Sequence, residues 1–307
     1  MADAPTTLKA VDTGNPKQDA ETDFSRARRR QQLSRLRARL RGEPGEVGVV
    51  LPFDEVIAAL GNRGEKRLGL QTIELDSIVG SVDREREFDR EFRPKTARLR
   101  GRWQGIAEAT RRGKSLPPID VYRIGDLHFV RDGHHRVSVA RHLGLDKIDA
   151  QVTEIKTAIG GDREITLADL PLKSHERLFF ERVPLKREHR SRISMRNGWD
   201  YAGLAEGVEA WGFRVMQARG EFMTREEVAE AWFHEDFLPV TEMIAEAELT
   251  RRGTTETEAY ARVVSLRYLL LRTHDWNDDV IERLRAELDH TSGSQDTFEH
   301  RLRSDLN

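Results

Sequence analysis

The chain has 307 residues, with 51 Lys and Arg against 53 Asp and Glu, a net charge of -2 and no cysteine. The absence of cysteine excludes disulfides, thiolate metal sites and cysteine nucleophiles, and the balanced charge gives no overall sign of a nucleic-acid-binding protein. No run approaches the ~20 apolar residues of a membrane span, and the first 24 residues lack the apolar core of a secretory signal. We therefore expect a cytoplasmic protein with no transmembrane segment and with one large or two modest domains.

The N-terminal segment, residues 1–45, has a polar part and a basic part. Its first 24 residues are small, polar and turn-forming, and we expect them to be disordered. The stretch from Ser25 to Gly42 contains eight arginines and no acid. Leu33, Leu36 and Leu40 have helical spacing there. Such a basic helix would either contact DNA, RNA or anionic lipid, or dock its leucines on the protein's own acidic surface.

Residues 46–160 predict a small domain in which strands and helices alternate. The stretch EPGEVGVVLPFDEVIAALG predicts a short strand and then a helix that ends at Gly61, and LGLQTIELDSIVG predicts a further strand. Leu99, Trp103 and Ile106 have helical spacing in the charged segment that follows.

The second half of this domain predicts a hairpin, a helix and a strand. The runs IDVYRIG and LHFVRDG flank Gly125 and Asp126, which is a hairpin signal. The run HRVSVARHLG predicts a helix that ends near Gly144, and KIDAQVTEI predicts the last strand. These patterns predict the fold class α+β, with a small mixed-sheet domain followed by a mainly helical region.

Residues 161–290 predict the helical C-terminal domain, and residues 291–307 a flexible tail. Thr224 and Thr255 are each followed three residues later by glutamate, which predicts two capping boxes. The stretch from Arg182 to Asn197 has seven basic groups against one acid. It would either meet phosphate backbones or form a solvated charged loop.

The stretch FVRDGHHRVSVARHLG carries the candidate site. Gly133 permits a sharp turn before a helix, whose first N–H groups lack intrahelical partners and attract anions such as phosphate. Arg136 offers donors suited to phosphate oxygens, and His134 and His135 can donate hydrogen bonds or move a proton. Asp132 could hold Mg2+ or accept a hydroxyl proton, or it could simply cap the helix. Adjacent helical histidines point about 100° apart, so we predict no metal chelation by the pair.

Residues 69–155 resemble the ParB/sulfiredoxin superfamily. The strand IELDSI, the strand LPPIDVYRIG, the motif LHFVRDGHHR and the helix and strand closing in LGLDKIDAQV follow the order and spacing of its members. The resemblance implies that the motif turn and the helix after it, Gly133 to Arg136, bind nucleotide phosphates. The implied ligand is CTP, ATP or ADP with Mg2+.

The motif departs from two branches of that superfamily. Sulfiredoxins have a catalytic cysteine in the slot of His134, and this chain has no cysteine. ParB partition proteins, which are CTP-dependent DNA clamps, have Gly-Glu-Arg-Arg, of which Gly133 and Arg136 remain. The Asp-Gly-His-His-Arg spelling is closer to free-serine kinases, in which a glutamate after the first strand acts as base. Glu85 and Glu87, with Asp132, are then the catalytic candidates.

Three functions remain open from the sequence. The first is a ParB-like nucleotide-binding protein that works with DNA as a partition-type factor or transcriptional regulator, with a homodimer as an open option. The second is an ATP- or ADP-dependent small-molecule kinase. The third is an interaction scaffold with no catalytic activity. Whether the chain is a nucleotide hydrolase, a phosphotransferase or no enzyme is therefore left open.

Overall fold

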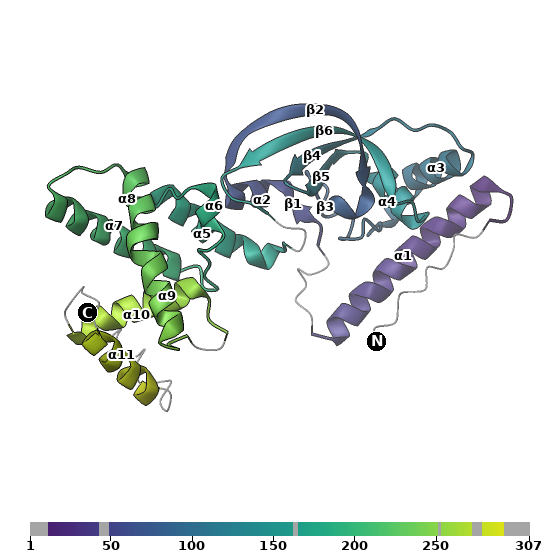
Figure 1. Cartoon of the computed structure of the whole chain (residues 1–307). Coiled ribbons are helices and arrows are strands. Elements are labelled where there is room, and N and C mark those ends of the chain that lie inside the picture. The colour runs from purple at the N-terminus through teal and green to yellow at the C-terminus, as the bar shows by residue number, and fades with distance from the viewer. Residues whose placement is uncertain (1–11, 43–48, 162–164, 251–252, 272–277, 292–307) are drawn as a thin grey trace. The chain divides into compact units, whose positions relative to one another are not determined.

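A computed structural model describes residues 12–42, 49–161, 165–250, 253–271 and 278–291 (Figure 1). The chain separates into two compact units, Met1–Arg177 and Leu178–Asn307, and each is described by itself. The predicted combination of a mixed sheet with helices is confirmed. None of the helices within the described ranges is long and apolar enough to cross a bilayer.

The first unit is built on a six-stranded mixed sheet in the order β1-β3-β5-β4-β6-β2. Parallel pairs join β1 to β3, β3 to β5 and β4 to β6, whereas β4–β5 and β2–β6 are antiparallel. Strands β2 and β6 form the long arched ribbon in Figure 1. The strands are β1 (Leu51–Pro52), β2 (Asn62–Glu74), β3 (Ile78–Ser81), β4 (Ile119–Ile124), β5 (Leu127–Asp132) and β6 (Lys147–Thr157).

The hairpin is confirmed, but one predicted strand is wrong. Ile124 pairs with Leu127 across the Gly125-Asp126 turn, and Gly125 has the positive φ of 56° that such a turn needs. The single strand predicted in LGLQTIELDSIVG is two strands, β2 and β3, separated by a 3-10 turn at Leu75–Ser77. Most of β2 is exposed and held by pairing with β6, so hydrophobic pattern could not reveal where it begins.

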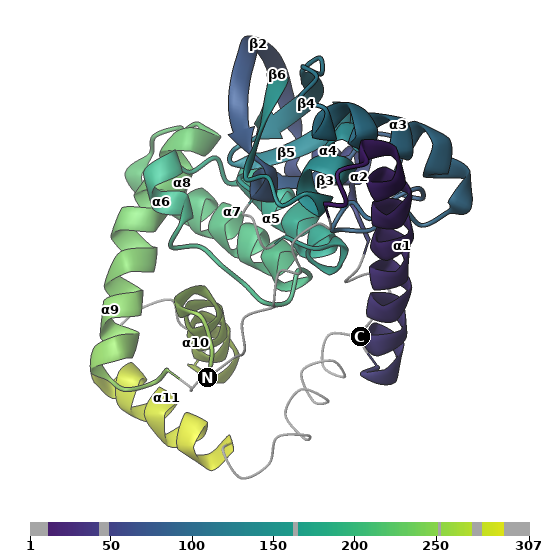
Figure 2. The same cartoon turned by 90° about the vertical axis from the view of Figure 1, so that its right-hand side faces the viewer.

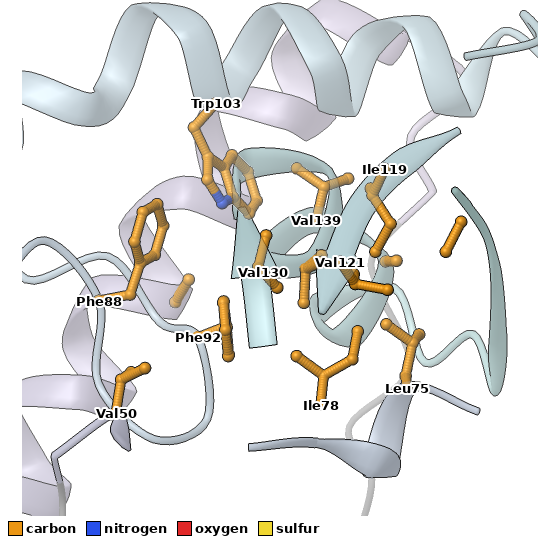
Figure 3. Packing of buried hydrophobic residues seen from close by; sticks show 14 of the residues in the cluster. Val50, Leu75, Ile78, Phe88, Phe92, Trp103, Ile119, Val121, Val130 and Val139 are labelled. Carbon is orange, nitrogen blue, oxygen red and sulfur yellow. The ribbon is translucent and has the colours of Figure 1, made fainter. Parts of the chain in front are cut away.

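Helices cover both faces of this sheet. Helices α3 (Arg100–Arg111) and α4 (His134–His142) pack on one face, and α2 (Phe53–Leu60) lies against the other. The helices predicted here are therefore confirmed. Figure 3 shows the core on the α3 and α4 side, where Trp103 and Phe88 approach the inward-facing Val121 and Val130.

The N-terminal helix α1 (Pro16–Leu40) begins earlier than predicted. Asn15 caps it by accepting a hydrogen bond from Gln18 N, and Pro16 occupies its first position. The predicted disorder is therefore wrong for residues 16–24, and residues 1–11 of that prediction lie outside the described residues. The capping signal was present in the sequence, but the polar composition hid it.

Helix α1 docks on α3 through its first half (Figure 2). Phe24 is fully buried, with its ring centroid 5.6 Å from that of Trp103. Asp23, also buried, accepts a hydrogen bond from Arg111 at 2.6 Å and lies 3.2 Å from His142 Nε2. The predicted docking of the α1 leucines is wrong, because Phe24 and Asp23 make the contacts with α3 instead. Leu33, Leu36 and Leu40 of α1 are exposed.

The second unit is helical in its described residues. Both predicted capping boxes are present, because Thr224 and Thr255 exchange hydrogen bonds with Glu227 and Glu258. Trp232 Nε1 donates to the Tyr260 hydroxyl at 2.9 Å in the core. The predicted tail from residue 292 onward lies outside the described part of the chain. Helix α5 (Leu170–Arg182) contains the division between the two units. The helices after it are α6 (Arg187–Arg190), α7 (Asp200–Arg219), α8 (Arg225–Trp232), α9 (Leu238–Glu246), α10 (Glu256–Leu271) and α11 (Asp278–Thr291).

Four cations of the basic stretch from Arg182 to Asn197 are paired with acids of this unit. The ion pairs are Arg182–Glu209, Lys186–Glu230, Arg192–Glu256 and Arg196–Glu258. These pairs connect the stretch to α7, α8 and α10. Contact of the stretch with phosphate backbones stays a prediction.

The docking of α1 can be tested by truncating Phe24. We expect Phe24→Ala to lower the free energy of unfolding of the first unit by about 3–5 kcal/mol, because it opens a cavity against Trp103. Leu36→Ala on the same helix is the control and should change it by less than about 0.5 kcal/mol, since Leu36 is 54% exposed. Urea unfolding followed by circular dichroism measures both. Equal effects would contradict the docking.

Candidate functional site

The candidate site is the turn between β5 and α4. Gly133, with φ 102°, forms the N-cap of α4 and makes no side-chain capping hydrogen bond, because glycine has no side chain. A Cβ at Gly133 would lie 2.5 Å from Ile119 Cγ2, so only glycine fits between the turn and β4. The helix therefore starts with its partial positive charge unopposed by a capping oxygen.

Arg136 holds the turn against the segment that leads into β4. Its guanidinium donates to the carbonyl oxygens of Pro117 and Pro118 at 2.5 and 2.7 Å, and to Asp132 Oδ2 at 2.5 Å. Its donors are therefore engaged with the chain itself, and its predicted phosphate contact stays a prediction. Asp132 is 67% exposed at its side chain and accessible to solvent.

The two histidines of the motif face the core. His134 is 3% exposed, and its Nε2 lies 2.8 Å from Ser81 Oγ at the end of β3. His135 is 5% exposed, and its ring meets the Phe88 ring edge to face at 5.4 Å. The predicted use of these imidazoles as donors to a phosphate stays a prediction.

Both imidazoles are neutral at pH 7. Burial, followed by the positive charge of Arg84, lowers the pKa of His134 to about 4. Burial, followed by the positive charges of Arg102 and Arg84, lowers the pKa of His135 to about 4. The histidines therefore bring no positive charge to the turn, and such charge must come from the arginines around it.

We call Arg84, Arg98 and Arg102 the arginine rim of the turn. Arg84 and Arg102 are close enough to His135 to act on its pKa. Arg98 is included because it shares an ion-pair partner with Arg84. The carboxylate of Glu87 lies 3.2 Å from Arg84 and 3.5 Å from Arg98. Arg98 and Arg102 are not among the site residues that the sequence suggested. Their i, i+4 spacing, around the first residue of α3, was the available signal.

The two glutamates predicted as catalytic are placed differently. Glu87 lies within the arginine rim, close enough to His135 to influence its pKa. Glu85 contacts Lys95 through its main-chain carbonyl, which accepts from Nζ at 2.9 Å. The structure thus brings Glu87 and the turn together.

A pocket of about 330 Å³ lies on the sheet, and its lining includes Arg131 and Asp120, the strand partner of Asp132. Its charged groups pair among themselves, because Arg131 donates to Asp120 and to the Tyr122 hydroxyl. None of the predicted site residues lines it. The lining residues are Glu65, Arg67, Gly69, Asp120, Tyr122, Arg131, Gln151, Val152 and Thr153.

The burial of neutral histidines predicts a pH dependence of stability. Their pKa is about 4 in the folded chain against an ordinary 6.5, so the unfolded chain binds more protons between these values. The contribution of these histidines to the free energy of unfolding should be complete above pH 6.5. It should fall as the pH is lowered toward 4, by up to about 1.4 kcal/mol per pH unit for each histidine. His135→Leu should flatten this decline in urea unfolding. A variant profile parallel to the wild type would contradict a buried neutral His135.

Comparisons with known proteins leave the function to be inferred from the chain's own residues. No protein-family model, curated protein or solved structure matches the chain. The features available for a functional assignment are therefore the uncapped start of α4, the arginine rim and the exposed carboxylate of Asp132.

Proposed function

We propose that this chain is a ParB-like nucleotide-binding protein that associates with DNA and binds nucleotide phosphates at the start of α4. The observation that carries the proposal is the uncapped N-terminus of α4 beside three arginines. Helix N–H groups and arginine forks are the donors that phosphate oxygens prefer. The resemblance of residues 69–155 to the ParB/sulfiredoxin superfamily supports the same ligand.

The donor set fits a nucleotide carried with Mg2+. The arginine rim contains one acid, Glu87, for its three cations, which leaves positive charge for a phosphate group. Asp132, exposed at the turn, would provide an oxygen ligand for Mg2+, which binds through few carboxylates plus substrate phosphates. Its pairing with Arg136 would have to loosen to do so. CTP, ATP and ADP share this phosphate chemistry.

The kinase alternative is favoured by one contact. Glu87 lies inside the arginine rim, where a base would meet a hydroxyl aligned with a bound phosphate. The same site would then transfer a phosphoryl group from ATP or ADP to a small hydroxyl compound. This alternative needs turnover, whereas the ParB-like proposal needs only nucleotide-dependent binding of DNA.

Calorimetric titration with CTP, ATP and ADP, each with Mg2+, tests nucleotide binding. We expect one of them to bind, and Arg102→Ala to weaken it about tenfold or more, since a charge-assisted hydrogen bond contributes roughly 1.5–3 kcal/mol. Arg112→Ala at the opposite end of α3 is the matched control, because Arg112 pairs with Glu108. It should bind as the wild type does.

The outcomes separate the alternatives. A preference for CTP favours the ParB-like protein, and phosphoryl transfer to serine that is lost in Glu87→Gln favours the kinase. No binding of any of the three nucleotides, or equal binding by the Arg102 and Arg112 variants, would contradict the proposed nucleotide site. The interaction scaffold would then be the favoured function.

DNA association is tested at the second half of α1. Arg35, Arg37 and Arg39 are exposed there, and their replacement by glutamine should weaken DNA binding. Each lost phosphate contact should reduce the slope of log affinity against log salt by about 0.9. The matched control replaces Arg182, Arg192 and Arg196, which are already paired with acids. Equal loss in both triple variants would contradict a specific role of α1.

A further inference from the structure

Three side chains of metal-ligand type meet in the second unit. His189 comes from α6, Glu230 from α8, and His234 from the π-helical turn Phe233–Phe237 that continues α8. One ligand atom from each lies within 4.8 Å of the others. His189 lies more than forty positions before Glu230 and His234, so motif reasoning, which considered only the two adjacent histidines of the first unit, did not find the cluster.

The distances approach those of a coordinated metal. Two ligands of a tetrahedral zinc ion, each about 2.1 Å from the metal, lie about 3.4 Å apart. His189 Nδ1 is 3.2 Å from Glu230 Oε2, and His234 Nε2 is 4.0 Å from the same oxygen. A change of side-chain rotation at His234, whose side chain is 53% exposed, would bring its nitrogen to coordination distance.

Two of the three ligand atoms are buried without a hydrogen bond. His189 Nδ1 and Glu230 Oε2 lie 3.2 Å apart without forming a hydrogen bond, and the charge partner of Oε2 is Lys186, whose Nζ lies 3.3 Å away. Leaving a buried atom such as His189 Nδ1 without a hydrogen bond costs free energy that a cation between the two ligands would recover. The other oxygen of the carboxylate, Oε1, accepts from Lys186 N at 2.8 Å, which aims Oε2 at the cluster.

The surroundings orient the ligands as the outer shell of a metal site does. The His189 ring stacks on Phe233 at 4.3 Å and 12°, which fixes its plane. Its second nitrogen, Nε2, lies 3.7 Å from Glu188 Oε1, where a carboxylate commonly supports a metal-bound imidazole. A π-helical turn beside Glu230 is also a feature found often at functional sites.

The competing cation is Lys186. Its Nζ lies 3.3 Å from Glu230 Oε2, and its side chain is largely exposed. An exposed lysine can swing into solvent when a divalent ion arrives, whereas its main-chain N–H would keep its hydrogen bond to the carboxylate. The lysine therefore opposes metal binding by its charge without blocking the position.

We propose that His189, Glu230 and His234 form a binding site for a divalent transition metal of the zinc class. Two imidazoles and one carboxylate suit Zn2+, Co2+ or Fe2+ better than Mg2+ or Ca2+, which prefer oxygen ligands. Three protein ligands leave a fourth position for water or a substrate atom. Metal binding here would also link α6 to α8, and the site is independent of the nucleotide proposal.

Titration of the chelator-treated full-length protein with Zn2+ tests this site. We expect one Zn2+ per chain by calorimetry, and a visible Co2+ spectrum that changes when the ligands change. His234→Ala and His189→Ala should each weaken Zn2+ binding at least tenfold.

Two controls make the result decisive. His175→Ala removes a histidine outside the cluster and should leave the affinity unchanged, and Lys186→Gln should keep or strengthen binding. Circular dichroism confirms that each variant is folded. No Zn2+ binding, affinity unchanged in both ligand variants, or an equal loss in His175→Ala would overturn the proposal and leave an ion-paired cluster only.

Discussion

The hydrogen bond between His134 Nε2 and Ser81 Oγ is the contact on which the candidate site depends. It ties the first turn of α4 to the end of β3, so that the helix starts beside the point where β3 leaves the sheet. The segment that follows β3 must then pass over the two imidazoles, and Phe88 and Phe92 cover them. The same passage carries Arg84 and Glu87 to the surface above the turn. Burying two neutral histidines thus fixes where the arginine rim lies.

Local pairing of charges, more than their total, distinguishes the surfaces of this protein. The net charge of -2 includes two basic stretches whose arginines differ in their pairing with acids. Arg182, Arg192 and Arg196 are held by glutamates of two helices, α7 and α10, whereas Arg35, Arg37 and Arg39 of α1 are exposed. Asp19 and Asp23 of α1 are buried in its first half, where Asp23 binds Arg111. Only an account of partners identifies which arginines can meet a phosphate.

The elements of the first unit were predictable where the chain contains strong local signals, and the side-chain roles were not. The hairpin at Gly125 and the helix after Gly133 follow from the φ values that glycine permits. The inward direction of His134 and His135 depends on Phe88, forty-six and forty-seven residues earlier in the numbering, and no local pattern encodes it. Leucine spacing in α1 was misleading because Phe24 and Asp23 find tertiary partners on other helices.

Helices α3 and α4 connect the two parts of the proposed function. Helix α3 begins next to Arg102 of the arginine rim and ends at Arg111, which binds Asp23 of α1. Helix α4 begins at the turn and ends at His142, whose Nε2 lies 3.2 Å from the same aspartate. A ligand that shifted the first turn of either helix would therefore act on the anchor of α1 through a rigid element. Asp23 contacts the last residues of both helices, Arg111 of α3 and His142 of α4. It is therefore the residue at which a nucleotide at the turn and DNA on α1 would be coupled.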